Sequence, residues 1–388
     1  MQFVVHIVFN FFTDNKQYSI AGMRRTIKEN TGISISRGAF WERLAGNRLK
    51  KIMESLVSLL MTRTIGAALA TNQILELLKI AGILVFDSST ITLMDIAEKE
   101  FPGTKNKAGI KWHACFDLFS GQSVWFTLSA SRKHDSNFFP PFELLKEKLI
   151  IFDLGYFDYQ LMVNLQAMGA YFLCRLKSNS VVFIEEVVSG FEKYSLGKSL
   201  LSIDNSTTFK GNILEAKVKT TTKNNSIMRC RAIGFWNDTE KHYHWYLTNL
   251  VVDAKIIYPL YRLRWQIELI FKSCKNSLNA NAIPSANPNI IQTLLLASIA
   301  AHLSSQTIHE IALNALSQEQ SCAITFQRVA FALVNLKNKF INCIVNPIQD
   351  NIEILINSIH QMINELYDPN YKKRETSKAK IHRILTTM

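Results

Sequence analysis

The chain has 388 residues, of which 48% are hydrophobic and 19% are charged, and its net charge is +13. The apolar content excludes wholesale disorder, and the length predicts two or three domains rather than one simple core. The positive charge predicts a polyanionic partner, nucleic acid first and an anionic membrane second. Scattered cysteines without a CxxC pair argue against a zinc ribbon or a disulfide framework and favour a reducing cytoplasm.

The first 80 residues are predicted to be helical with polar joints. The opening "MQFVVHIVFNFF" is apolar but short, and it lacks the basic leader and cleavage site of a signal peptide. In "ENTGISISRGAFWERL", Gly32 suits the end of one helix and Ser34 or Ser36 suits the N-cap of the next. Such a pair is typical of a helix-turn-helix, but short helical pairs are also common elsewhere. We expect residues 1–80 to be a helical, DNA-binding region.

From residue 81 the pattern changes to alternating strands and helices. "GILVFD" predicts a buried strand ending at Asp87, and "LIIFD" predicts a second one ending at Asp153. Between them, "GIKWHACFDLFSG" and "QSVWFTLSA" predict a hairpin around Ser120 and Gly121, and "NFFPPFELLKEKL" predicts a helix. "DYQLMVNLQAMGA" predicts a helix that closes near Gly169, and "YFLCRL" another strand. The order is therefore three strands, helix, strand, helix, strand.

The remaining chain predicts a β-rich insertion and then helices. Residues 176–250 contain segments in which basic and apolar positions alternate on either side of an Asn224-Asn225 turn. After residue 255 the chain is predicted to be helical, and it finishes in the basic tail "YKKRETSKAKIHR". The apolar stretch "IIQTLLLASIAAHLSS" is interrupted by polar residues, which indicates a buried helix rather than a membrane span. Nucleic acid therefore remains the expected partner.

The segment "YRLRWQIELIFKSCKN", residues 261 to 276, combines polar and apolar faces. In a helix, Tyr261, Arg264, Glu268 and Lys275 would fall within an arc of about 60°. The apolar residues on roughly the opposite side are Leu263, Ile267, Ile270, Cys274 and Leu278. In an isolated helix, the simpler interpretation is a solvated face with an i,i+4 ion pair between Arg264 and Glu268.

Three carboxylates change that interpretation. Asp87 and Asp153 each end a predicted buried strand, where a charge is costly unless it is paired or bound to a metal. Aspartates at strand ends often cap the next turn, but two of them together with Glu268 fit poorly with coincidence. Hard divalent cations prefer oxygen ligands, and two ions about 3.5–4 Å apart can stabilise both the attacking and the leaving oxygen of a phosphodiester displacement.

These blocks resemble the DDE transposases of bacterial insertion sequences, specifically the insertion sequence four family. The family's helix signature is Tyr, two residues, Arg, three residues, Glu, six residues, Lys. The matching positions are Tyr261, Arg264, Glu268 and Lys275. The family's two aspartates resemble Asp87 in "DSST" and Asp153 in "DLGYF", and "RKHDS" around Asp135, "LTNL" at 247–250 and the β insertion are also similar. The resemblance covers about residues 80 to 310.

The resemblance implies an α/β fold, namely a ribonuclease H-like mixed sheet flanked by helices, with an inserted β-rich subdomain and helical N- and C-terminal regions. The expected division is 1–80 for the N-terminal region, 81–175 and 251–315 for the catalytic domain, 176–250 for the insertion, and 316–388 for a C-terminal helical region with its basic tail. The insertion is expected to project as a separate lobe.

The resemblance also implies a transposase that cleaves insertion-sequence ends and transfers DNA strands in a cut-and-paste reaction. Asp87, Asp153 and Glu268 would be the catalytic residues and the ligands of two Mg²⁺ ions, for which Mn²⁺ could substitute, with carboxylate oxygens converging to roughly 4–8 Å. Arg264 and Lys275 would hold phosphates. Tyr261 would donate its hydroxyl to a phosphate or be an ordinary half-buried tyrosine, and Trp265 would stack on an unpaired base or pack in the core.

The implied partners are DNA, as terminal inverted repeats and as target, and a second copy of the chain in the DNA complex. The implied location is the bacterial cytoplasm, at the nucleoid when acting. Lys105, Lys107 and Lys111 are expected to contact the DNA backbone, and His113 and His134 to be structural.

Two alternatives stay open. One is a catalytically silent, transposase-derived DNA-binding protein. The other is a phosphatase of haloacid dehalogenase-like pattern, which the sequence disfavours because Ser89 stands where that pattern needs a second Asp.

Overall fold

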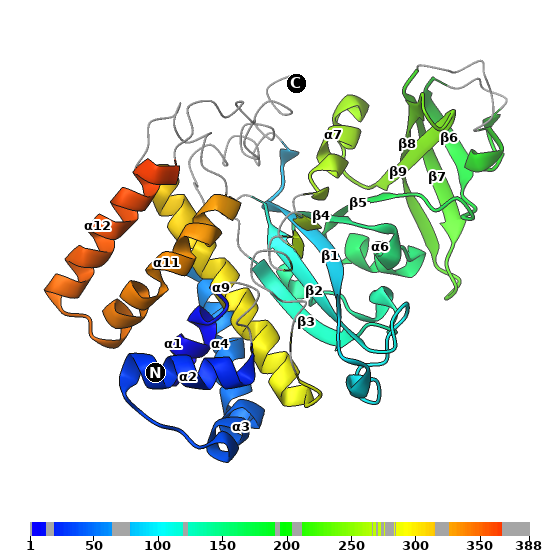
Figure 1. The fold of residues 1–388 in the computed structure, drawn as a ribbon. Helices are drawn as coiled ribbons and strands as arrows, with labels where there is room; N and C mark the ends of the chain where they lie inside the picture. The colour runs from blue at the N-terminus through cyan, green and yellow to red at the C-terminus, as the bar shows by residue number, and fades with distance from the viewer. Residues whose placement is uncertain are drawn as a thin grey trace.

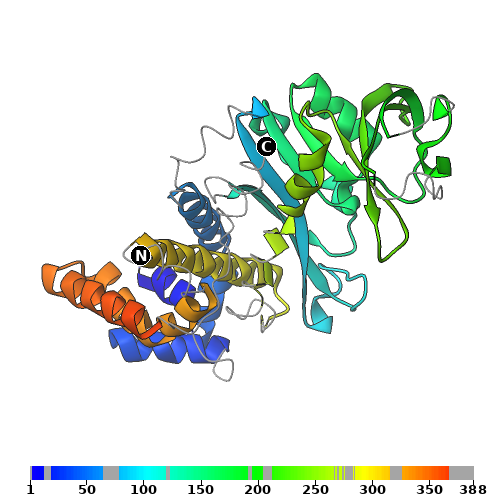
Figure 2. The ribbon, with the colours of Figure 1, turned by 90° about the horizontal axis from the view of Figure 1, so that it is seen from above.

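The computed structural model describes residues 2–12, 19–63, 78–118, 123–190, 195–203, 212–265, 267–268, 271–272, 275, 283, 285–314 and 326–366. A group of helices lies beside a large sheet in both views (Figures 1 and 2). The helices of that group are α1 (Gln2–Phe9), α2 (Ile20–Thr31), α3 (Arg37–Ala45), α4 (Asn47–Arg63), α9 (Pro288–Asn314), α11 (Phe326–Val345) and α12 (Gln349–Leu366). The long helix α9 packs against α1, α3, α4, α11 and α12, so helices from both ends of the chain share one body.

The sheet has nine strands in the order β3-β2-β1-β4-β5-β9-β8-β7-β6. The strands are β1 (Gly82–Thr92), β2 (Gly109–Asp117), β3 (Ser123–Ala130), β4 (Lys148–Phe152), β5 (Tyr171–Arg175), β6 (Phe183–Ser189), β7 (Leu214–Thr221), β8 (Ile227–Asn237) and β9 (His242–Thr248). β1, β4 and β5 are parallel, and β2 and β3 are antiparallel to their neighbours. This arrangement confirms the expected ribonuclease H-like fold class.

The β insertion continues the core sheet. β9 pairs antiparallel with β5, and β8, β7 and β6 follow it outward. The expectation of a lobe separate from the sheet is therefore wrong, because one hydrogen-bonded ladder runs through both parts. The "LTNL" segment closes the junction: Thr248 Oγ1 donates to the carbonyl of Phe172 (2.6 Å). Asn249 Oδ1 accepts from the N–H of Phe172 (2.8 Å), and Asn249 Nδ2 donates to the carbonyl of Ala170 (2.9 Å).

Successive residues of a strand point to opposite faces of a sheet, and the apolar residues here cover both faces. Ile83 and Val85 belong to a buried cluster shared with α7 (Ile257–Arg262), α9 and the N-terminal helices. Leu84 and Phe86 belong to a second cluster shared with α6 (Tyr159–Ala167). The sheet is therefore sandwiched, with α6 on one face and α7 and the helical body on the other.

Local signals in the N-terminal region are confirmed. Gly32 ends α2 in the left-handed conformation (φ 71°), where glycine is favoured. The hydroxyl of Ser36 accepts from the N–H of Ala39 (3.2 Å) and caps α3. The apolar stretch near residue 295 lies inside the buried helix α9. In the described ranges, no helix combines the length and apolar character needed to cross a membrane.

Two expected elements differ. The segment "NFFPPFELLKEKL" forms only a short 3₁₀ turn at Phe142–Leu144, because Glu147 takes the left-handed conformation (φ 60°) and β4 begins at Lys148, which leaves too few residues for a helix. β1 does not end at Asp87 but runs on to Thr92, because residues 87 to 92 continue to pair with β2 after the pairing with β4 has stopped at Phe86.

The junction between core and insertion generates a stability prediction. Asn249→Ala would leave the buried N–H of Phe172 and the carbonyl of Ala170 without partners, so we expect a loss of about 2–4 kcal/mol in the free energy of unfolding. Asn249→Asp keeps the acceptor and should cost less. Asn164→Ala on the exposed side of α6 is the control, expected within about 0.5 kcal/mol of the parent. Equal urea midpoints for Asn249→Ala and Asn164→Ala would contradict the role of Asn249.

Candidate active site

Asp87 and Asp153 follow neighbouring parallel strand segments. Phe86 in β1 pairs with Phe152 in β4, and the two aspartates come next in each chain segment. Neighbouring strands lie about 4.8 Å apart. The sheet register therefore puts both backbones at the same level, although 66 residues separate them in the sequence.

Glu268 comes from the chain segment after α7. Leu263, Ile267 and Phe271 are spaced four residues apart and are all buried in the cluster against the sheet, with the ring of Phe271 4.9 Å from that of Trp112 in β2. This stripe holds the segment across the β1–β2 region, as expected for Leu263 and Ile267. The other apolar residues expected on this face, Ile270, Cys274 and Leu278, lie outside the described residues.

The predicted single helix from 261 to 276 is not uniform. α7 ends at Arg262. The N–H groups of Leu263, Arg264 and Ile267 then bond to carbonyls three residues earlier, at 3.0, 3.0 and 3.2 Å. Three-residue hydrogen bonds tighten the turn relative to an α-helix. The tight turn lies immediately before and around Arg264, the residue that contacts both acids.

Arg264 joins the strand to the helical segment. Its Nη1 is 2.7 Å from Asp87 Oδ2, and its Nη2 is 2.5 Å from Glu268 Oε1. The side chain of Arg264 is only 14% exposed, and that of Asp87 13%. The structure thus brings Asp87, Arg264 and Glu268 together, and it holds the guanidinium against carboxylates rather than toward solvent.

The carboxylate of Asp87 and the guanidinium of Arg264 both have shifted pKa values. Burial raises the pKa of Asp87 to about 7, and the neighbouring carboxylates of Asp153 and Glu268 raise it too. Arg264 and the backbone N–H of Ser88, 2.7 Å from Asp87 Oδ1, act in the opposite direction. For Arg264, burial lowers the pKa, but Asp87 and Asp153 outweigh it and leave the pKa above its ordinary value. Among the described side chains, the guanidinium of Arg264 bonds to Asp87 and Glu268, and the charge of Asp153 also acts on it.

The donor set suits a hard divalent cation. Its three acids, Asp87, Asp153 and Glu268, offer only oxygen atoms, which Mg²⁺ and Mn²⁺ prefer. Burial is the main reason that the pKa of Asp87 is near neutrality, and a bound cation would favour the charged form of this carboxylate. These residues fit the divalent metal that the sequence resemblance implies.

The other predicted residues of the segment differ in exposure. Tyr261 is half-buried, its ring is 4.9 Å from that of Tyr246, and burial raises the pKa of its hydroxyl. Trp265 is 56% exposed, so it is not a core residue. Lys275 is half-buried.

A second network, which the sequence did not identify, supports the same strand from the opposite face. Asp135 accepts a hydrogen bond from Ser88 Oγ (3.0 Å) and pairs with Lys111 Nζ (2.8 Å). A Cβ at Gly155 would lie 3.0 Å from Asp135 Oδ2, so Asp135 also packs against the turn that follows Asp153. Asp135 thus contacts both aspartate-bearing segments. Its only sequence signal is its place in "RKHDS".

The lysines and histidines that the sequence analysis singled out near the site differ in their contacts. Lys111 is in the ion pair with Asp135 and is 11% exposed, so its ammonium group faces this carboxylate rather than open solvent. Lys107 pairs with Asp95 on the surface (3.5 Å). His113 is buried between Tyr156 and Ser129, and burial lowers its pKa to about 4, which agrees with a structural, neutral histidine.

Comparisons with known proteins identify similar sequences. A family profile described as a transposase DDE domain matches residues 79–304, which include Asp87, Asp153 and Glu268. The transposase for insertion sequence element IS1151 from Clostridium perfringens is 22% identical over 272 residues, covering 58% of this chain and 56% of that protein. The transposase for IS231D from Bacillus thuringiensis subsp. finitimus is 24% identical over 237 residues, covering 50% and 49%. The matched region thus spans about half the length of these relatives.

Among solved structures, the chain is similar to one in the cryo-EM structure of the piggyBac transposase synaptic complex with hairpin DNA. The TM-score is 0.45 at 11% sequence identity, and the match covers 97% of this chain and 77% of that one.

The raised pKa of Asp87 predicts a pH-dependent difference in stability. The folded pKa of about 7 exceeds the ordinary value of 3.8, so the folded state binds more protons between these values and loses stability as the pH rises. Without divalent cations, the difference in unfolding free energy between Asp87→Asn and the parent protein should shift in favour of the variant by on the order of 3 kcal/mol between pH 5 and pH 8. Urea unfolding across this range measures it.

The control is Asp95→Asn, which removes an exposed carboxylate paired only on the surface. Its difference from the parent should stay nearly constant with pH. If Asp87→Asn and Asp95→Asn showed the same pH dependence, the carboxylate of Asp87 would not be the destabilised group.

Proposed function

The chain belongs to the family of transposase DDE domains, and from this premise we propose that it is a DNA transposase. It cleaves the ends of an insertion sequence and joins them to target DNA in a cut-and-paste reaction. The observation that supports this most is the junction at Arg264, which bonds to Asp87, 177 residues earlier in the chain, and to Glu268, beside Asp153. A structural ion pair alone would not need a third acid at the neighbouring strand end.

Asp87, Asp153 and Glu268 are the proposed catalytic residues. Their oxygen-only donor set would hold two Mg²⁺ ions, with Mn²⁺ as a substitute. When bound, such ions neutralise charge on the attacking and leaving oxygens of a phosphodiester and favour ionisation of the attacking group. The two aspartates present their carboxylates from neighbouring strands, and Glu268 presents its carboxylate from the helical segment packed across the sheet.

Arg264 orients two of these carboxylates. Its planar fork spans Asp87 and Glu268, which fixes the direction of both oxygens, and lysine could not do this because it is a point charge. Contact between Arg264 and a phosphate would need one of these bonds to open. Lys275 supplies a cation for the DNA backbone, the hydroxyl of Tyr261 donates to a phosphate, and the exposed indole of Trp265 stacks on an unpaired base.

The N-terminal helices are proposed to bind the terminal inverted repeats. The turn between α2 and α3 is braced by a hydrogen bond from Arg24 Nη1 to the carbonyl of Ile35 (3.3 Å). Exposed basic side chains line α2 to α4, which suits phosphate contacts: Arg25, Lys28, Arg37, Arg43, Arg48 and Lys51.

The division of labour follows the proposed boundaries. Residues 1–80 bind DNA, 81–175 with 251–315 carry catalysis, 176–250 are the β insertion, and 316–388 form the C-terminal helical region. The chain acts as a homodimer on its DNA, at the nucleoid of a bacterial cytoplasm.

Neutral replacement of the acids tests the catalytic proposal. Asp87→Asn, Asp153→Asn and Glu268→Gln should each reduce Mg²⁺-dependent cleavage of DNA carrying the element's ends by about 100-fold or more, because the charge that binds cations is lost. Binding of the same DNA should change little. A gel-based cleavage assay and a binding titration on the same substrate measure both.

Glu100→Gln on the exposed surface is the control and should cleave like the parent. Cleavage near the parent level by any of the three acid variants would remove that residue from the site. If the parent itself binds the ends but never cuts them, the chain is a catalytically silent DNA-binding protein.

The cationic residues predict two separable effects. Lys275→Ala should lower the slope of log affinity against log salt by about 1, because one phosphate contact is lost. Arg264→Lys should keep this slope but reduce cleavage, because it retains the charge and loses the fork that orients Asp87 and Glu268. Titrations of end-bearing DNA at several salt concentrations measure the slopes.

Lys272→Ala, an exposed lysine on the same segment, is the matched control for lost charge. An unchanged slope in Lys275→Ala together with parent-like cleavage in Arg264→Lys would indicate that neither residue acts on the substrate as proposed.

A further inference from the structure

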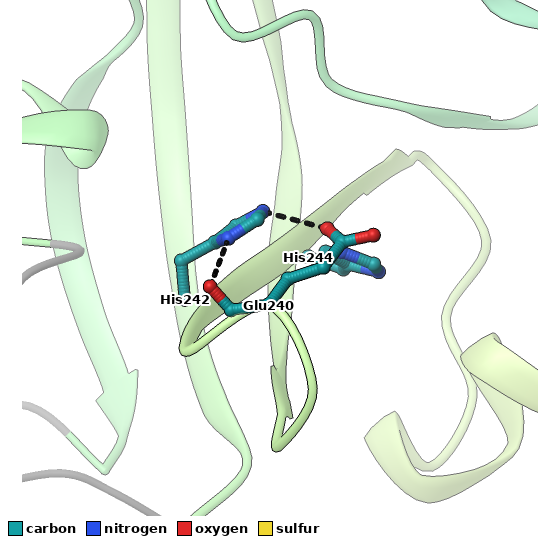
Figure 3. A group of neighbouring side chains, drawn as sticks. All are labelled: Glu240, His242 and His244. Atoms are coloured by element: carbon teal, nitrogen blue, oxygen red, sulfur yellow. Dashed lines mark hydrogen bonds and ion pairs between the residues drawn. The ribbon is translucent and has the colours of Figure 1, made fainter.

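A second group of ligand-type side chains lies at the turn between β8 and β9, in the β insertion (Figure 3). His242 and His244 are two residues apart in β9 and therefore share one face of the strand. Tyr243 and Trp245 point the other way and are each only 2% exposed. Glu240, in the turn just before β9, lies beside both imidazole rings.

The three side chains converge on one point. Glu240 Oε2 is 2.6 Å from His244 Nε2 and 3.2 Å from His242 Nε2. The two ring centroids are 5.0 Å apart, and the three ligand atoms all lie within 4.8 Å of one another. Modest rotation of partly exposed side chains suffices to place all three at the 2.0–2.2 Å bond lengths of a bound transition metal.

The turn that carries Glu240 is held by its own hydrogen bonds. Asn237 Oδ1 accepts from the N–H groups of Thr239 (2.9 Å) and Glu240 (3.2 Å). The N–H of Lys241 bonds to the carbonyl of Asn237 (2.8 Å), and Lys241 takes the left-handed conformation (φ 58°), which is uncommon for a residue with a side chain. The carboxylate of Glu240 is thus presented by a preformed turn.

The hydrogen bonds also orient the ring nitrogens. His242 Nδ1 lies 3.1 Å from the carbonyl of Glu240, and a carbonyl can only accept, so Nδ1 carries the proton. In the neutral ring this leaves the lone pair of Nε2 facing Glu240 Oε2. His244 differs, because the amide nitrogen of Asn237 lies 3.2 Å from its Nε2, the same nitrogen that faces Glu240, and a metal ion at Nε2 would replace this contact. A backbone carbonyl on the far nitrogen is the usual partner of a metal-binding histidine.

The carboxylate of Glu240 thus meets the Nε2 atoms of both histidines, and either a proton or a metal ion on these nitrogens would offset its negative charge. Arg175 at the end of β5 offsets the charge only partly, because its Nη2 is 3.8 Å from Glu240 Oε2. Lys241 adds a cation to the same turn. A hard ion such as Mg²⁺ would find one carboxylate and two nitrogens here, which is a poor set for it.

We propose that Glu240, His242 and His244 form a binding site for a borderline divalent transition metal ion, Zn²⁺ first, with a fourth position open to water. Two imidazoles and one carboxylate match the preference of Zn²⁺ for nitrogen and oxygen in tetrahedral geometry. The site is chemically distinct from the oxygen-only group of Asp87, Asp153 and Glu268. A bound ion fixes the β8–β9 turn and, through the neighbouring Arg175, secures it against β5 of the core.

Calorimetric titration of Zn²⁺ into the full chain tests the proposal, with Mg²⁺ in large excess to occupy the oxygen-only site. The parent should bind one equivalent of Zn²⁺ that the double variant His242→Ala/His244→Ala binds at least about 10-fold more weakly. Glu240→Gln, which keeps the size of the side chain and removes its charge, should also weaken binding. His360→Ala, an exposed histidine on α12, is the matched control and should bind Zn²⁺ like the parent.

Thermal unfolding supplies a second readout. Zn²⁺ should raise the Tm of the parent and of His360→Ala but not of the double variant, because an ion that binds only the folded state stabilises it. If the double variant is poorly folded, the single variants Glu240→Gln and His242→Gln replace it, and each should show a smaller rise in Tm with Zn²⁺ than the parent.

Equal Zn²⁺ affinity in the parent and the histidine variants would overturn the proposal. So would histidine NMR signals at 242 and 244 that move with pH and stay unchanged on adding Zn²⁺, since protons alone would then supply the positive charge. Neither measurement uses DNA, so the result does not depend on whether the chain cleaves it.

Discussion

The site depends on one ion-pair constraint: the carboxylate of Asp87 is buried within β1 and is stabilised in its charged form by a cation. Arg264 supplies it, and the same guanidinium holds Glu268. Removing one partner of a buried pair leaves the other charge without compensation, which is far more costly than removing both. The contact therefore links the position of the helical segment after α7 to that of β1, and brings two acids close together.

Contacts on both faces of the sheet hold β1 near Asp87. Residue alternation sends Asp87 toward Arg264 on one face and Ser88 toward Asp135 on the other. Asp135 is itself paired with Lys111 and packs against Gly155, just after Asp153. The chain from 87 to 88 is thus held from both sides, and the same network reaches the second aspartate. Residues that hold the segments bearing Asp87 and Asp153 in place thereby reduce the freedom of the proposed ligands.

Because the β insertion is part of the core sheet, it helps to position the connection to α7. β9 returns the chain to the edge of β5, and Thr248 and Asn249 complete the hydrogen bonds where the ladder ends. Arg231 further binds the carbonyls of Leu250 and Val252 in the connection to α7. These bonds fix the start of the segment that bears Arg264 and Glu268 relative to β5 and β8.

Local patterns in the sequence determined the strands around Asp87 and Asp153, the caps at Gly32 and Ser36, and the buried stripe through Leu263 and Ile267, because these depend on residue periodicity and short-range hydrogen bonds. The spacing of Tyr261, Arg264, Glu268 and Lys275 likewise singled out the candidate site. Tertiary structure alone decided that the insertion extends the core sheet and that Asp135 bonds to Ser88 in β1. It also decided that Arg264 faces Asp87 and Glu268 rather than solvent, and that Glu240 lies beside His242 and His244. These outcomes depend on strand register and on pairs of residues far apart in the chain, and such contacts leave no periodic trace in the sequence.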